Sequence, residues 1–172
     1  TAVMDNPFGY GRVIRDGEGH MVRIVEQKDG TPDELAVKEI NTGTYCFEIG
    51  ALLQALPKLT CDNAQGEYYL TDVFELMIRE GRFVVPVPAD DAEETMGVNS
   101  RSQLAAADKV LRRRKAEALM ADGVSIIDPD RVYIQQDVKV GRDTVLLPGV
   151  ILEGKTVVGS GCRIGPDTEL DN

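Results

Sequence analysis

Residues able to do nucleophilic or metal chemistry are few in this sequence, and their spacing excludes several enzyme classes. His20 is the only histidine, and Cys46, Cys61 and Cys162 lie far apart along the chain. Zinc sites draw Cys and His ligands from short spacings, and a Ser-His-Asp triad needs a histidine base. Three scattered cysteines form no disulfide framework and no Cys-x-x-Cys motif. We therefore predict no catalytic side chain of these kinds.

The charge balance limits the partners that this chain can have. It holds 29 acidic and 19 basic side chains among 172 residues, with a net charge of −10. Nucleic-acid binding needs clustered Lys and Arg, and the one dense basic run, residues 112–115, is expected to be a solvated helix face with some pairing between subunits. No stretch approaches the roughly 20 apolar residues of a membrane span. We expect a cytoplasmic protein without nucleic-acid binding or membrane insertion.

Residues 1–98 have the pattern of a mixed α/β region. Turn-forming residues 16–19 separate two strand-like runs, and an i, i+3, i+4, i+7 apolar pattern indicates an amphipathic helix that Gly81 caps. The expected elements are strands over residues 10–15, 21–26, 36–48 and 83–87, and helices over residues 49–56, stopped by Pro57, and 70–78.

Residues 99–122 are expected to form one long helix. Asn99 or Ser100 can cap its start, and Gly123 can end it. Its composition of Ala, Leu, Lys and Arg favours helix. The expected apolar face consists of Leu104, Ala107, Leu111 and Ala118.

Residues 123–172 change to a period of six. An aliphatic residue recurs at every sixth position, namely Ile134, Val140, Leu146, Leu152, Val158, Ile164 and Leu170. No helical period gives this spacing, whereas a parallel β-helix with three faces per coil directs one residue of each hexad inward. The period does not determine the hand of the coil, because parallel crossovers are right-handed in nearly all proteins.

Five segments in order resemble motifs of one enzyme family. They are Gly9-Tyr10-Gly11-Arg12, the run Ile24 to Asp29, Glu39-Ile40-Asn41-Thr42-Gly43, the run Gln65 to Asp72, and Gly97-Val98-Asn99-Ser100-Arg101. With the long helix and the hexads behind them, they are similar to the bacterial bifunctional N-acetylglucosamine-1-phosphate uridylyltransferases, the GlmU type. The similarity covers nearly the whole chain and indicates an internal fragment of a longer protein.

The resemblance implies an α/β fold in three parts. Residues 1–98 would be the C-terminal part of a Rossmann-like nucleotidyltransferase domain. Residues 99–122 would be a linker helix, and residues 123–172 the first coils of a left-handed parallel β-helix of hexapeptide repeats. The left hand of the coil rests on the resemblance alone.

The resemblance also implies an activity for the parent protein. It would make UDP-N-acetylglucosamine from UTP and N-acetylglucosamine-1-phosphate with Mg²⁺, and acetylate glucosamine-1-phosphate with acetyl-CoA, for cell-wall precursor synthesis. The parent would be a cytoplasmic homotrimer. The family's Gly-rich phosphate loop and its acetyltransferase residues have no counterpart here, so we expect the fragment by itself to be inactive.

Four residues match sugar-site positions of the family. Gly11 would let the backbone approach the sugar, Glu26 would accept from its hydroxyls, and Asn41 would offer both an amide donor and an acceptor. Asn99 would contact both substrate and Mg²⁺, which prefers oxygen ligands. Each also has a structural interpretation: a strand-entry glycine, a solvated strand end, an Asx turn and a helix cap. Tyr69 and Thr71 are weaker candidates for the same pocket.

Two alternatives remain open. The parent could be a nucleotidyltransferase for another pair, such as glucose-1-phosphate and ATP, because base selection lies outside this chain in the family. The chain could also be a non-catalytic trimerisation module built from the helix and the repeats.

Overall fold

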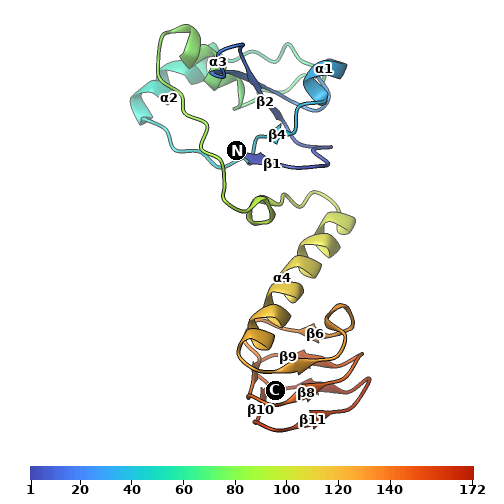
Figure 1. Ribbon diagram of the computed structural model, residues 1–172. Coiled ribbons are helices and arrows are strands. Elements are labelled where there is room, and N and C mark those ends of the chain that lie inside the picture. The colour runs from blue at the N-terminus through green and yellow to red at the C-terminus, as the bar shows by residue number, and fades with distance from the viewer. The chain divides into compact units, whose positions relative to one another are not determined.

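The computed structural model describes residues 1–172. Contacts divide the chain into two compact units, Thr1–Gly97 and Val98–Asn172. Figure 1 shows the short sheet and helices of the first unit and the long helix and stacked strands of the second. None of the helices combines the length and the apolar character that a membrane crossing requires.

A four-stranded antiparallel sheet organises the first unit. Its strands are β1 (Ala2–Val3), β2 (Arg12–Arg15), β3 (Met21–Val25) and β4 (Glu39–Ile40), in the order β1-β4-β2-β3. The predicted hairpin of β2 and β3 is confirmed. Its turn is held by Asp16, whose Oδ1 accepts the main-chain N–H groups of Glu18 and His20, each at 2.9 Å. This hairpin carries residues 11 and 26 at its open end.

Helices on the sheet close the core of the first unit. They are α1 (Pro32–Leu35), α2 (Ile49–Ala55) and α3 (Asp72–Arg79), with 3₁₀ turns η1 (Leu56–Lys58) and η2 (Ala92–Thr95). The apolar face of α3, with Val73, Phe74 and Met77, packs in one cluster with Val13 and Ile24 of the sheet. Burial of this stripe explains why the amphipathic pattern forms a helix here. Gly81, at φ 74°, ends α3 as predicted.

Two strand predictions in the first unit are wrong. The strand expected over residues 36–48 is only Glu39–Ile40, because the Asn41 side chain accepts the Gly43 N–H and turns the chain. The strand expected over 83–87 does not form, and Phe83 is 93% exposed. The predicted end of the helix at Pro57 is confirmed, because α2 ends at Ala55. Pro57 itself lies in the first turn of η1, where a missing N–H costs nothing.

The second unit begins with the predicted long helix, α4 (Arg101–Ala121), whose N-cap is Ser100 and whose end is followed by Gly123 at φ 96°. The predicted apolar face is wrong: Leu104 and Leu111 are 58% and 60% exposed, and Ala116 and Leu119 are the buried residues. Only the last turns of α4 pack on the strands that follow. The basic run is also paired within the chain, with Arg112 lying over the Tyr133 ring at 4.1 Å.

Eight short strands follow α4 and form three parallel sheets, β5-β8-β11, β6-β9-β12 and β7-β10. They are β5 (Ser125–Ile126), β6 (Tyr133–Ile134), β7 (Lys139–Val140), β8 (Val145–Leu146), β9 (Ile151–Glu153), β10 (Val157–Val158), β11 (Arg163–Ile164) and β12 (Glu169–Asp171), with η3 (Pro129–Arg131) between the first two.

Strand pairing in the second unit repeats at a distance of 18 residues, which is three hexads. Tyr133 pairs with Ile151, Ile151 with Glu169, and Lys139 with Val157. The aliphatic hexad positions point into one core, where Leu146 and Leu152 are fully buried. The prediction that these residues share an interior is therefore confirmed.

Candidate functional site

Gly11, Glu26 and Asn41 lie together at one end of the β2–β3 hairpin. The Asn41 N–H donates to the Gly11 carbonyl at 2.8 Å, which joins the end of β4 to the start of β2. A Cβ on Gly11 would lie 3.0 Å from Ile24 Cγ2 and 3.3 Å from both Glu26 carboxylate oxygens. A side chain at position 11 would therefore be tight against Ile24 and Glu26, a contact that the sequence context of Gly11 did not reveal.

Glu26 follows β3 and is held by Thr71. The Thr71 hydroxyl, buried at the start of α3, donates to Glu26 Oε1 at 3.0 Å. Glu26 Oε2 makes no hydrogen bond within the chain, so one carboxylate oxygen remains an acceptor for a ligand. Thr71, a weaker candidate from the sequence, thus contacts a predicted site residue directly.

Tyr69 lies beside the same carboxylate and is held by two residues that sequence analysis missed as site residues. Its hydroxyl donates to Asp29 Oδ2 at 3.2 Å and accepts from Gln65 Nε2 at 2.8 Å. Burial raises the pKa of Tyr69, and the hydrogen bond to Asp29 and the charges of Asp29 and Glu26 raise it further. The only sequence signal for the contact between Gln65 and Tyr69 is that both residues lie in one motif, four positions apart.

Asn41 is held by two donors on its side-chain oxygen. Oδ1 accepts the Gly43 N–H at 3.1 Å and the Tyr45 hydroxyl at 2.9 Å. The Tyr45 ring packs against Phe47 and Phe74, with centroids 5.7 and 5.1 Å away. Burial raises the pKa of Tyr45, and the charge of Glu26 raises it as well, which places both groups in one electrostatic environment.

Asn99 belongs to the second unit and is exposed. Its N–H donates to Gln103 Oε1 at 2.7 Å, and the capping side chain is that of Ser100, not Asn99. No group of three or more His, Cys, Asp or Glu side chains is placed to hold a metal ion. An amide oxygen suits Mg²⁺, but one such oxygen is not a site, so the residues of this chain do not fit a complete Mg²⁺ centre.

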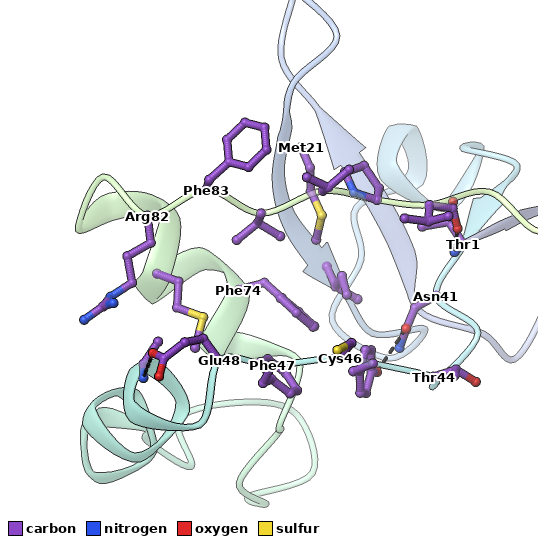
Figure 2. Close-up of a pocket in the computed structure, with 18 of the residues that line it drawn as sticks. Thr1, Met21, Asn41, Thr44, Cys46, Phe47, Glu48, Phe74, Arg82 and Phe83 are labelled. Atoms are coloured by element: carbon purple, nitrogen blue, oxygen red, sulfur yellow. Dashed lines mark hydrogen bonds between the residues drawn. The ribbon is translucent and has the colours of Figure 1, made fainter.

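Two cavities flank the predicted sugar residues. The larger, of about 810 Å³, is mainly apolar, and its lining includes Asn41, Met21, Phe47 and Phe74 (Figure 2). The smaller, of about 380 Å³, has a more polar lining that includes Tyr69 and the carboxylates of Glu26, Asp29 and Asp72. Burial raises the pKa of Asp72, and the charges of Glu75, Glu26 and Asp29 add to that effect.

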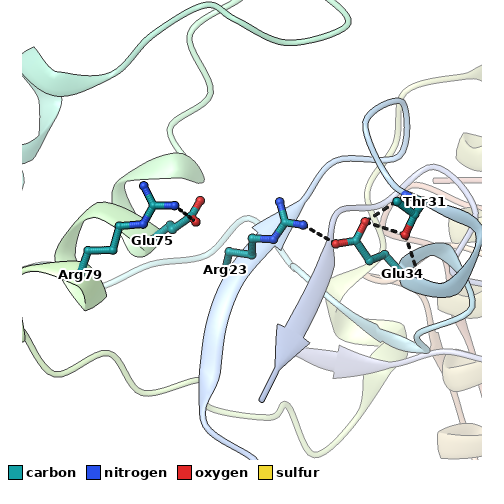
Figure 3. A network of polar contacts seen from close by, with 5 residues as sticks. All are labelled: Arg23, Thr31, Glu34, Glu75 and Arg79. Carbon is teal, nitrogen blue, oxygen red and sulfur yellow. Dashed lines mark hydrogen bonds and ion pairs between the residues drawn. The ribbon is translucent and has the colours of Figure 1, made fainter. Parts of the chain in front are cut away.

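The cations around the smaller cavity already have carboxylate partners. Arg23 pairs with Glu34, which also closes the Thr31 capping box of α1, and Arg79 pairs with Glu75 at 2.6 Å (Figure 3). Lys58, the remaining cation there, pairs with Glu80. A phosphate group needs unpaired cations or converging N–H groups. This arrangement therefore suits neutral hydroxyls better than a phosphate.

Comparison with known proteins finds relatives that share a single name. No family model matches the chain. It is 53% identical over 170 residues to the "Bifunctional protein GlmU" of Carboxydothermus hydrogenoformans, 52% identical over 170 residues to that of Geobacillus sp. strain WCH70, and 56% identical over 164 residues to that of Lactobacillus johnsonii. These matches cover 99%, 99% and 95% of this chain but 38%, 37% and 36% of the relatives. Over nearly its whole length the chain is therefore similar in sequence to GlmU proteins, and it spans less than two fifths of the length of those proteins.

Proposed function

We propose that this chain is part of a bifunctional GlmU-type enzyme. Its nucleotidyltransferase activity makes UDP-N-acetylglucosamine from UTP and N-acetylglucosamine-1-phosphate. Its second activity acetylates glucosamine-1-phosphate with acetyl-CoA, and both serve cell-wall precursor synthesis. The observation that carries the proposal is 53% identity along 99% of the chain to a protein of that name, together with the assembly of Gly11, Glu26 and Asn41 at one site.

The chain contributes the sugar side of the first active site in this proposal. Glu26 Oε2 is available to accept from a sugar hydroxyl. Asn41 is joined through its main-chain N–H to Gly11, and the Glu26 carboxylate lies against Gly11. Carboxylate and amide groups suit a polyol because they match its donors and acceptors in fixed directions. The paired cations leave the phosphates to be bound by the remainder of the enzyme.

The reaction requires positioning more than a protein nucleophile. The sugar phosphate attacks the α-phosphorus of UTP in line and expels pyrophosphate, so orientation and charge neutralisation supply most of the catalysis. Gly11, Glu26 and Asn41 orient the sugar. By the resemblance, Asn99 would contact substrate and would be one oxygen ligand of Mg²⁺ among others that this chain does not supply.

The proposal includes a division of the chain into three parts. Residues 1–98 are the C-terminal part of the nucleotidyltransferase domain, residues 99–122 the linker helix and residues 123–172 the first coils of a left-handed β-helix. The 18-residue register of three parallel sheets supports a coil of three hexads. Exposed apolar side chains on its outer faces, at Ile127, Tyr133 and Val157, are consistent with a homotrimer.

A chimera tests the function. This chain replaces the matching region of the Carboxydothermus hydrogenoformans protein, and UDP-N-acetylglucosamine formation is measured with UTP and N-acetylglucosamine-1-phosphate. We expect an active chimera and no activity from the isolated chain. Glu26→Gln should raise the KM for the sugar phosphate. A chimera that prefers ATP and glucose-1-phosphate would identify the alternative nucleotidyltransferase, and an inactive chimera that folds would contradict the proposal.

A further inference from the structure

The hydrogen-bond state of Asn41 limits what this residue can offer to a ligand. A side-chain amide has one carbonyl with two lone pairs and one NH₂ group with two donors. Both acceptor positions of Asn41 Oδ1 are used, by the Gly43 N–H and the Tyr45 hydroxyl. Asn41 Nδ2 makes no hydrogen bond within the chain, so its donors alone remain for a ligand.

The orientation of the amide follows from chemistry. A main-chain N–H is a donor only, so the atom that faces Gly43 at 3.1 Å must be the oxygen. The Gly43 bond by itself would still allow the plane of the amide to tilt. The second bond, from Tyr45 at 2.9 Å, comes from a ring that the aromatic contacts with Phe47 and Phe74 hold in place.

We propose that Tyr45 is a positioning residue of the sugar site, which fixes the Asn41 amide so that its NH₂ group, and not its carbonyl, faces the ligand. This inference rests on the proposed function. It revises the expectation that Asn41 offers both a donor and an acceptor. The group recognised is the acetyl carbonyl of an N-acetyl sugar, an oxygen that can only accept. Glu26 Oε2 supplies the complementary acceptor for a hydroxyl proton.

Two variants separate positioning from simple packing. Tyr45→Phe removes the hydroxyl and keeps the ring contacts. Asn41→Asp keeps an oxygen for Gly43 and Tyr45 but replaces the NH₂ donors with a second acceptor. Tyr68→Phe is the matched control, because Tyr68 is 70% exposed and the same hydroxyl is lost outside the site.

The test titrates the 172-residue chain with N-acetylglucosamine, whose lack of charge avoids repulsion by the new carboxylate. Binding is followed by the main-chain amide NMR signals of residues 41–45 in every variant, and also by the Asn41 side-chain NH₂ signals where residue 41 is Asn. We expect these signals to shift in the native chain with weak, millimolar binding. Tyr45→Phe should weaken binding roughly two- to tenfold, the range for one neutral hydrogen bond. Asn41→Asp should weaken it by about tenfold or more, because a ligand acceptor then faces an acceptor. Tyr68→Phe should bind like the native chain.

Each contrary result overturns the inference. Native affinity in Asn41→Asp would show that the carbonyl side serves the ligand, and native affinity in Tyr45→Phe would show that Tyr45 positions nothing. Asn41 signals that do not shift in the native chain would show that the amide does not meet the sugar.

In the chimera, Tyr45→Phe should raise the KM for the sugar phosphate and leave kcat within about twofold. An active chimera that Tyr45→Phe does not change would refute the inference alone, whereas an inactive native chimera would refute the proposed function.

Discussion

Gly141 and Gly159 occupy equivalent positions in successive coils, and we predict that Ala is tolerated at only one of them. The two residues follow Val140 and Val158, which pair in parallel. A Cβ on Gly141 would lie 2.6 Å from the Ser160 nitrogen and 2.7 Å from the Gly159 carbonyl carbon. A Cβ on Gly159 meets only Cys162 Sγ, at an ordinary contact distance of 3.7 Å.

The magnitude follows from what must move. At Gly141 the obstacle is the main chain of the next coil, which cannot rotate away as a side chain can. Overpacking of this kind costs about 1–3 kcal/mol. The same shift strains the bonds from Gly141 N–H to Val158 and from Gly161 N–H to Arg142, both 2.9 Å and each contributing about 1 kcal/mol. We expect Gly141→Ala to lower the free energy of unfolding by about 3 kcal/mol, and Gly159→Ala by less than about 0.5 kcal/mol.

The assay is hydrogen exchange of main-chain amides in β7 and β8, read by NMR or mass spectrometry. It reports the stability of the second unit, Val98–Asn172, separately from that of the first. Gly141→Ala should speed exchange of the Lys139 and Val145 amides on the order of a hundredfold, the equivalent of about 3 kcal/mol. Gly159→Ala is the control for glycine replacement as such. Equal exchange rates in the two variants would refute the reasoning, because they would mean that the second coil does not lie against Gly141.

Two further predictions concern the core and the charges. Leu152→Ala, at a fully buried hexad position, should cost about 2–5 kcal/mol, whereas Leu111→Ala, at a 60% exposed position of α4, should cost less than about 0.5 kcal/mol, as measured by urea unfolding. The hydrogen bonds from Arg15 lower the pKa of Glu39 below its ordinary value of 4.5, so the stability that Glu39 contributes is present above pH 4.5 and is lost as the pH falls through its folded-state pKa. Glu39→Gln should flatten that acid limb of unfolding free energy against pH, and an unchanged limb would contradict the assignment.

Local patterns in the sequence were sufficient for several elements. The i, i+3, i+4 spacing around Phe74 predicted α3, and the turn residues at 16–19 predicted the β2–β3 hairpin. The six-residue period predicted the interior row that includes Leu146 and Leu152. Each of these signals is short in range, because the residues that repeat lie within one turn or one coil of each other.

Other features depended on partners distant in the sequence. The candidate site residues were identified by resemblance, but their contacts were not: Thr71 reaches Glu26 across 45 positions, and the Glu26 carboxylate lies against Gly11. The buried face of α4 is Ala116 and Leu119, since only the end of that helix meets the strands.

The sequence by itself therefore determined the type of each repeating element, the inward row of the hexads and the family that the motifs resemble. The tertiary structure decided which apolar positions are buried, where strand-like runs turn instead, and which atoms of Glu26 and Asn41 remain available. The physical reason is that periodicity reflects hydrogen bonding and burial along one element. Whether a side-chain atom is free to bind a ligand depends instead on the donors and acceptors around it. The Tyr45 hydroxyl is such a donor, and only the packing of the aromatic cluster directs it toward Asn41.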